Sequence, residues 1–278
     1  MSRLKFINFT KMEDNSKAIA VWNKVLGAAM SLPGVKVNRK EFLSGKLLPY
    51  CTHENALKAI NGNPTKVIDI AILNKIADSV ISSHTTKVTA ISAVAGLPGG
   101  IAMAATIPAD IAQYYWHTLV VSQKLAYIYG WPDLLDKDGN LSDDAVNLLT
   151  VFLGVMSGVA VANEGINAAA RALSVQVVKR LPKMALTKTV IYPIAKQVAK
   201  WLGIQLTKEN FAKAIGKAIP VLGGIISGGI TLSTFLPQAR RLKRKLQKQA
   251  DLFKNAKETI DTKNAEDVEY EDVSSDTD

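Results

Sequence analysis

Asp110 and His117 are the residues whose types and spacing point most directly to chemistry. They lie seven residues apart in an otherwise apolar helical segment, so both fall on one face two turns apart, with Gln113 near the same stripe. Together with His84 or Glu164 from other segments, they could complete a metal site or supply an enzyme with an acid and a base. The same residues suit a buried polar network that fixes helix register, and we favour that interpretation.

Two further clusters are weaker candidates. Cys51 and His53 are two residues apart, and no third group that would orient them is evident nearby, which argues against a nucleophilic pair. The loop 134–142 resembles the start of a calcium loop, but Leu134 and Ala145 stand at the first and last ligand positions, where carboxylates are essential. A polar turn that leads into the helix N-cap Ser142 explains that loop. We therefore predict no catalytic residue, no metal, no cofactor and no enzymatic activity.

Charge is distributed unevenly along the chain. The 278 residues have a formal net charge of +10, yet residues 258–278 hold nine acidic groups and one lysine, so residues 1–257 carry +18. Just before the tail, six cations fall within nine residues: Arg240, Arg241, Lys243, Arg244, Lys245 and Lys248. Such a cluster attracts polyanions. We predict a disordered acidic tail and a basic segment that contacts anionic lipid; nucleic acid is disfavoured because no reading helix or aromatic-interleaved basic stripe is present.

Apolar periodicity predicts helices throughout and no strands. Helical patterns occupy 18–29, 54–60, 67–81, 111–129, 164–180, 188–202, 208–218 and 238–260. Thr52 is the predicted N-cap of the helix at 54–60, and Ser142 is that of a further helix. The predicted fold class is an all-α multi-helix bundle. Its predicted parts are an N-terminal extension over 1–15, a helical domain over 16–257 and the tail. The single cysteine and the lack of an apolar signal at the N-terminus predict a cytoplasmic protein.

Three stretches lack Asp, Glu, Lys and Arg: 88–109, 145–163 and 218–239. Residues 96–100 interrupt the first, Pro220 and Pro237 bound an element in the third, and the second is marginal against the roughly 20 apolar residues that span a bilayer. Small or turn-forming residues recur in them, and we predict hairpin turns and close helix packing at Gly96, Pro98, Gly99, Gly100, Gly154, Gly158, Gly224 and Gly228. Glycine-rich hairpins buried in a peripheral or soluble protein are favoured over spanning helices, and insertion after a trigger stays open.

Several segments resemble the EcsC protein family, in the family's order along the chain. These are residues 22–43 with Leu-Pro-Gly-Val-Lys-Val-Asn-Arg, 89–100 with Gly-Leu-Pro-Gly-Gly, 107–110, 123–130, and 219–229 with Val-Leu-Gly-Gly-Ile-Ile-Ser-Gly-Gly. The resemblance covers roughly residues 20–250. It implies a bacterial, helical protein whose work is close to a membrane, and it defines no catalytic residue that could be carried onto this chain.

Two functions follow as expectations. The first is a non-enzymatic protein acting at the inner membrane surface through its basic segment and glycine-rich hairpins, with a membrane-perturbing effector in stress or phage defence as a sharper version. The second is a soluble interaction module that regulates or assembles a transporter or other complex. Both leave the protein partner and the oligomeric state open.

Overall fold

The chain folds as an all-α protein in the part that a computed structural model describes, namely residues 20, 22–95, 109–175, 191–200 and 220–254. Side chains of 92–95, 109–110, 175 and 220–231 lie outside that description. The described residues contain no strand, and one isolated bridge joins Leu135 to Leu141. The predicted all-α class is therefore confirmed for them. The predicted extension, the helix at 208–218, the glycine-rich turn at 96–100 and the acidic tail lie outside the described residues.

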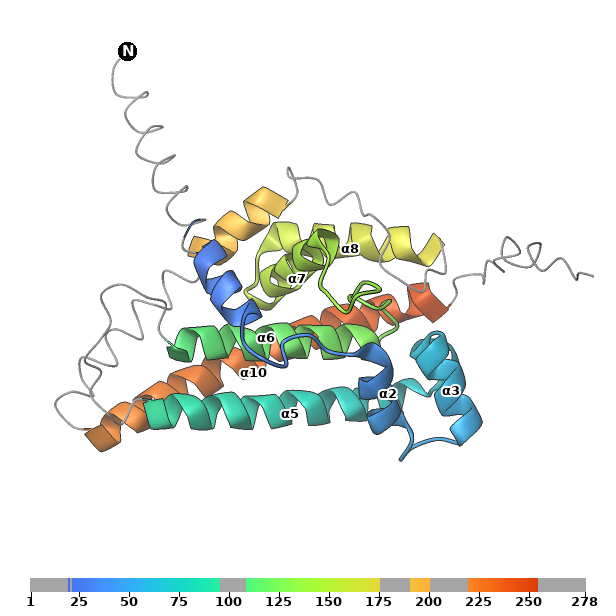
Figure 1. Ribbon diagram of the computed structural model, residues 1–278, viewed down its shortest axis with the longest axis horizontal. Coiled ribbons are helices and arrows are strands. Elements are labelled where there is room, and N and C mark those ends of the chain that lie inside the picture. The colour runs from blue at the N-terminus through green and yellow to red at the C-terminus, as the bar shows by residue number, and fades with distance from the viewer. Residues whose placement is uncertain (1–19, 21, 96–108, 176–190, 201–219, 255–278) are drawn as a thin grey trace, which may run out of the picture.

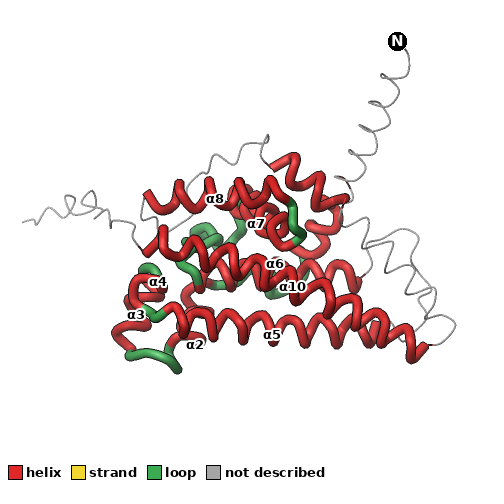
Figure 2. Tube along the Cα trace, turned by 180° about the vertical axis from the view of Figure 1, so that it is seen from behind, coloured by secondary structure: helices red, strands yellow, loops and turns green. Residues whose placement is uncertain are grey.

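Eight helices have defined bounds in this part of the chain. They are α2 (Arg39–Leu47), α3 (His53–Asn61), α4 (Pro64–Val67), α5 (Ile70–Ala95), α6 (Ala109–Ile128), α7 (Asp143–Met156), α8 (Ala160–Val175) and α10 (Pro220–Lys254). Residues 22–30 and 191–200 are helical as well. Figure 1 shows α5, α6 and α10 running lengthwise beneath α7 and α8, and Figure 2 shows the same arrangement from behind.

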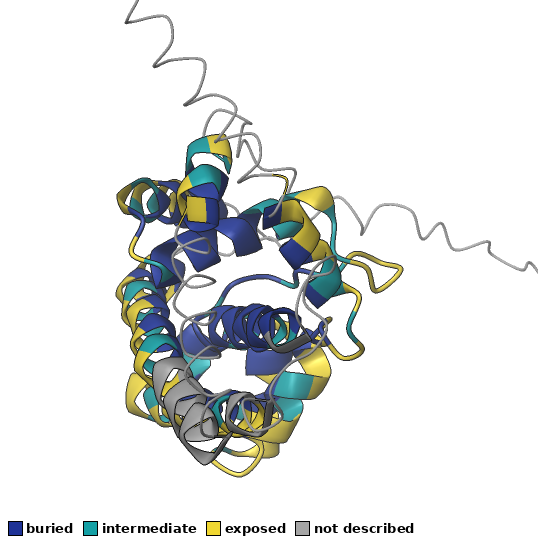
Figure 3. Ribbon diagram, turned by 90° about the vertical axis from the view of Figure 1, so that its left-hand side faces the viewer, coloured by how far each residue is buried: buried dark blue, intermediate teal, exposed yellow. Residues whose placement is uncertain are grey.

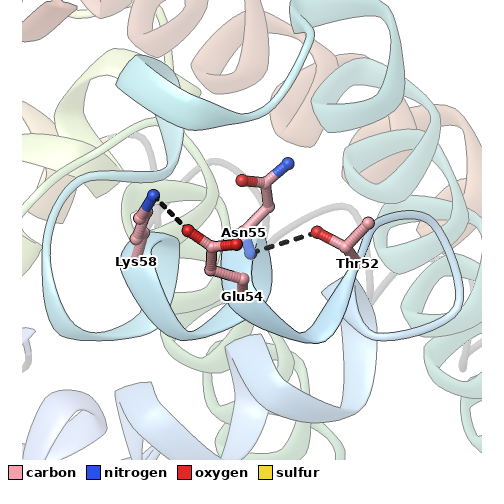
Figure 4. A network of polar contacts seen from close by, with 4 residues as sticks. All are labelled: Thr52, Glu54, Asn55 and Lys58. Atoms are coloured by element: carbon pink, nitrogen blue, oxygen red, sulfur yellow. Dashed lines mark hydrogen bonds and ion pairs between the residues drawn. The ribbon is translucent and has the colours of Figure 1, made fainter.

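Local sequence explains where several helices begin. The Thr52 hydroxyl accepts the backbone N–H of Asn55 at 3.3 Å, which satisfies one of the free donors of the first turn of α3. One turn on, Glu54 and Lys58 form an exposed ion pair at 2.6 Å (Figure 4). Ser142 caps α7 in the same way through the N–H of Ala145. The helix starts predicted from Thr52 and Ser142 are confirmed.

Helix α6 is the centre of the bundle. Almost all of its described side chains are buried, and it contacts α2, α4, α5, α7 and α10. A helix that is enclosed on all sides needs apolar residues around its whole circumference, which the run from Ile111 to Tyr129 provides. Viewed along the bundle, buried residues face inward and exposed residues face outward (Figure 3). Polar residues within α6 are therefore held in the core.

Helices α5 and α10 lie side by side and run in opposite directions (Figure 1). Two predictions about them are wrong. Residues 67–81 do not form one helix, because α4 ends at Val67, Asp69 accepts the N–H of Ala71, and α5 then continues to Ala95. Likewise Pro237 does not separate two elements, since it lies inside the 35-residue helix α10. A helix can tolerate the loss of the backbone N–H that proline lacks when the turns before and after the proline are packed against other helices.

The second charge-free stretch is a helix–turn–helix. Helix α7 ends at Met156, Gly158 has a φ of +79°, and α8 begins at Ala160. Gly154 lies where α7 meets its neighbours so closely that an added Cβ would be 2.7 Å from the Ala162 Cβ. In the described part of the chain, no helix combines the length and apolar character needed to cross a bilayer.

Buried polar side chains join the short N-terminal helices to the bundle. The Arg39 guanidinium donates to the carbonyls of Ile60 at 2.6 Å and Gly62 at 2.8 Å, so it links α2 to the end of α3. Burial lowers the pKa of Arg39, and the nearby Asp133 carboxylate opposes that shift. The Gln123 amide of α6 accepts from Val37 N–H and donates to a carbonyl in the same loop. These contacts hold α2 beside α3 and α6.

Candidate functional site

A pair of histidines is buried between α5 and α6. The Nδ1 atoms of His84 and His117 are 2.9 Å apart, and the two residues are only 5% and 2% exposed. The rings meet edge to face with centroids 5.2 Å apart, and the Trp116 ring lies edge to face against His117 at 4.7 Å. Burial lowers the pKa of His84 to about 3 and that of His117 to about 4, so both rings are neutral at pH 7.

Lys124 of α6 extends this pair to a third residue. Its Nζ lies 2.9 Å from the Nε2 of His84, and the ammonium also lies over the Phe42 ring at 5.8 Å from the centroid. Lys124 is partly buried, and desolvation followed by repulsion from Lys87 lowers its pKa to about 8. We call His84, His117 and Lys124 the buried cluster.

The hydrogen bonds of the buried cluster have a direction. A neutral histidine has one donor and one acceptor nitrogen, and an ammonium can only donate. When Lys124 is charged, it donates to Nε2 of His84, whose Nδ1–H then donates to Nδ1 of His117. The Nε2–H of His117 is left as a buried donor with no hydrogen-bond partner among the described residues. When Lys124 is neutral, the whole chain can reverse.

Two exposed lysines act electrostatically on the buried cluster. Lys87 of α5 lowers the pKa of His84, His117 and Lys124, and Lys46 of α2 lowers that of Lys124. None of the described carboxylates contributes an opposing shift to these three groups. The cluster is therefore a cationic site without a counter-charge in the described part of the chain, which suits an anion and disfavours a metal cation.

The structure brings together only some of the residues predicted to form a site. His84 and His117 meet, as one predicted combination required, whereas Glu164 is exposed on α8. Gln113 is half-buried one turn before His117, and Asp110 lies in the first turn of α6, with its side chain outside the described set. Across the described residues, no three His, Cys, Asp or Glu side chains are grouped closely enough to hold a metal ion.

The two weaker candidates have local structural roles. The Cys51 thiol donates to the Leu47 carbonyl at 3.3 Å, while His53 is exposed in the first turn of α3. In the loop before α7, the Asp136 carboxylate accepts the backbone N–H groups of Asp138 and Asn140. These contacts close a tight polar turn.

The basic segment lies on α10, and its six cations divide into two groups. Arg240, Arg244 and Lys248 are exposed and recur every four residues, so they form one line about 12 Å long on the outer face of the helix. We call these three the basic row. In the described part of the chain, no carboxylate lies within ion-pair distance of them. Asp251, one turn after Lys248, is exposed as well.

The other three cations of the segment contact the protein or are partly buried, although Arg241 is still exposed. Lys243 forms a 2.7 Å ion pair with Asp78 of α5, and its side chain is only 14% exposed. The Arg241 guanidinium donates to the carbonyl of Met156 at the end of α7. Lys245 is half-buried, and burial lowers its pKa. Leu242 and Leu246 are buried on the face of α10 opposite the basic row, which fixes the orientation of the row.

Lys124 is the functional candidate that the sequence analysis missed. It lies seven residues after His117, so a search for polar residues two turns apart on this apolar helix would have found it. No protein-family model matches the chain, and no curated protein or solved structure is significantly similar to it. The resemblance to the EcsC family stays a prediction, and a functional proposal must rest on the residues themselves.

Proposed function

We propose that this chain is a peripheral protein that docks on an anionic membrane surface through the basic row of α10. The observation that supports the proposal most strongly is the geometry of Arg240, Arg244 and Lys248, which are exposed, aligned and without a described carboxylate partner. A flat array of cations on a rigid helix can approach a lipid surface with all of its charges at once.

The energy expected from the basic row is enough for reversible binding. Each cation near an anionic leaflet contributes about 1 kcal/mol, so three contribute about 3 kcal/mol, or roughly 100-fold in the partition coefficient at low salt. Lys243 contributes little, because its charge is paired with Asp78. The Arg241 guanidinium keeps its charge, but its hydrogen bond to the Met156 carbonyl holds it at the end of α7 and outside the basic row. The row is therefore expected to act as an electrostatic anchor that salt weakens.

Vesicle co-sedimentation tests the proposal. The full chain is mixed with vesicles of phosphatidylglycerol and phosphatidylcholine, and with vesicles of phosphatidylcholine alone. We expect binding to the anionic vesicles only. A variant with Arg240→Gln, Arg244→Gln and Lys248→Gln should lose most of that binding.

A matched variant controls for total charge. Lys24, Lys40 and Lys137 are exposed outside α10, so their replacement by Gln removes the same charge from the protein. This control should bind within about threefold of the unchanged chain, since its three cations do not form one row. Equal losses in the two variants, or no binding to anionic vesicles at all, would contradict docking through α10.

A helical interaction module is the second candidate, and exposed apolar side chains favour it. Leu48 and Tyr50 after α2, and Leu57 in α3, are 43%, 40% and 45% exposed. Apolar groups at the N-terminal helices can contact a protein partner while leaving α10 free. Failure to bind vesicles of either composition would place this candidate first. A membrane-perturbing role would build on docking, and it depends on glycine-rich segments that lie largely outside the described residues.

A further inference from the structure

The buried cluster has the layout of a nucleophile, a histidine that positions it and a second histidine that orients the first. Lys124 supplies an amine at the partly exposed end, and His84 Nε2 lies within hydrogen-bond reach at 2.9 Å. The Nδ1 of His117 forms a hydrogen bond with the Nδ1 of His84, also at 2.9 Å. This sequence of contacts is the general arrangement that activates a side-chain nucleophile. It is independent of the basic row and of the docking proposed above.

The amine of Lys124 has the reactivity that the layout requires. Only the unprotonated form attacks a carbonyl carbon, and a pKa of about 8 leaves about one tenth of the amine neutral at pH 7. Lys87 and Lys46 raise that fraction by repelling a proton from Lys124. The Phe42 ring covers part of the side chain, so the amine is also shielded from water.

The surrounding charges indicate which carbonyl compound fits. Lys87 and Lys46 both act on Lys124 from neighbouring helices, α5 and α2, and no described carboxylate offsets them. A ligand that carries a phosphate or carboxylate beside its carbonyl group would supply the missing negative charge. A neutral carbonyl compound would leave the lysines without a counter-charge.

We propose that Lys124 forms an imine with a small aldehyde or ketone that carries an anionic group. The neutral amine attacks the carbonyl carbon, a carbon–nitrogen bond forms, and the carbonyl oxygen takes up a proton to give a carbinolamine. Loss of that oxygen as water then gives the carbon–nitrogen double bond. His84 acts as a positioning residue, because its Nε2 accepts a hydrogen bond from the Lys124 nitrogen and holds it in place. Water carries the two protons that the nitrogen loses to the carbonyl oxygen, which leaves as water.

Pyridoxal phosphate is the probe, because it is an aldehyde with a phosphate, and its analogue pyridoxal lacks that phosphate. Pyridoxal also closes to a cyclic hemiacetal, so all rates for Lys124 are taken relative to those of the exposed Lys24 and Lys40 with the same compound. The full chain is incubated with either compound, the imine is reduced with borohydride, and the modified lysines are located by peptide mass spectrometry. We expect Lys124 to be labelled at least about tenfold faster than the exposed Lys24 and Lys40. Its labelling should reach half its maximum near pH 8. Pyridoxal should label it about tenfold more slowly than pyridoxal phosphate.

Three variants separate chemistry from folding. Lys124→Arg keeps the cation and should abolish labelling at this position alone. Lys87→Gln changes an exposed residue, and it should move the midpoint for Lys124 to higher pH and reduce the preference for pyridoxal phosphate. His84→Gln should slow labelling of Lys124 at least about tenfold at every pH, with an unchanged helical circular dichroism spectrum.

Three results would overturn the proposal. The first is uniform labelling of exposed lysines, the second is a Lys124 that stays unmodified in the folded protein, and the third is a Lys124 midpoint above pH 10. Equal rates with pyridoxal and pyridoxal phosphate would overturn the part that assigns an anionic ligand. If His84→Gln does not fold, the pH midpoint of Lys87→Gln decides the question, and no shift there contradicts the cationic site.

Discussion

The buried cluster and the basic row are both built from basic side chains, and the surrounding protein treats them in opposite ways. His84 and His117 are enclosed between α5 and α6, and they have lost their charge to burial. Arg240, Arg244 and Lys248 stand on the outer face of α10 and are solvated. Exposure therefore decides how a basic side chain can act in this protein. On the outer face it can bind a surface by its charge, whereas in the interior it can act in its neutral form.

Acid should break the buried cluster before it affects the basic row. Both histidine pKa values are lower in the folded protein than the ordinary value of 6.5, so the unfolded chain binds protons first as the pH falls. The free energy of unfolding should be unaffected by these groups above pH 6.5 and should fall between pH 6.5 and 4. We expect a loss of about 3 kcal/mol from either ring alone, measured by urea unfolding at each pH.

The variant that removes the basic row is the control for this acid effect. Its unfolding free energy should show the same decrease between pH 6.5 and 4, because solvated cations do not change their protonation there. A double variant, His84→Gln with His117→Gln, should have a shallower decrease. An identical decrease in the double variant would show that other groups cause the acid sensitivity.

Replacing one lysine in each region should change stability to different extents. The pKa of Lys124 is near 8 in the folded protein and 10.5 when exposed. As the pH falls from 10.5 to 8, the unfolded chain binds the proton first, so the free energy of unfolding decreases. Below pH 8 both states are protonated and the decrease stays constant. Lys124→Met should therefore raise the free energy of unfolding at pH 7 by about 1–2 kcal/mol, after the loss of its contact with His84. Lys248→Met should change it by less than about 0.5 kcal/mol. Thermal and urea unfolding of both variants measure this contrast, and a destabilised Lys124→Met would contradict it.

Salt should separate the two regions in a binding assay. Exposed charges are screened over about 10 Å at 0.1 M ionic strength, so vesicle binding through the basic row should decline steeply between low salt and about 0.5 M. Labelling of Lys124 by neutral pyridoxal, which depends on a partly buried amine, should change by less than about twofold over the same range. Parallel loss of both signals would mean that the two regions are not distinct.

Removal of the acidic segment should give the smallest effect. Residues 258–278 carry a net charge of −8 and follow α10 in the sequence, so they compete with anionic lipid for the basic row. A chain ending at residue 257 should bind phosphatidylglycerol vesicles several-fold more tightly at low salt, and equally at high salt. Unchanged binding at low salt would contradict competition between the acidic segment and anionic lipid for the basic row.

Local signals in the sequence predicted the helix starts that side chains determine. Thr52 and Ser142 cap α3 and α7 because each hydroxyl accepts an N–H three residues ahead, which needs no tertiary contact. The continuity of α10 through Pro237 was not predictable in this way, since it depends on packing against α5 and α6. Tertiary packing outweighed a local breaker there.

The candidate site shows the same division. His117 and the apolar helix around it are visible in the sequence, and His84 was named as one of two partners. The pairing itself depends on the register between α5 and α6, which no local pattern reveals. The orientation of the basic row was likewise hidden, because Leu242 and Leu246 show which face of α10 is buried only once its neighbours are known.

The most direct test of docking through α10 measures which face of the protein meets the lipid. Cys51 is the only cysteine, so Cys51→Ser gives a background in which one fluorophore can be attached at a chosen position. The label is placed at Gln247→Cys beside the basic row, or at Asp138→Cys in the exposed loop before α7. Quenching by lipids with a quencher on the headgroup is then recorded on phosphatidylglycerol vesicles. The account predicts strong quenching at position 247 and little at 138; equal quenching, or stronger quenching at 138, would contradict it.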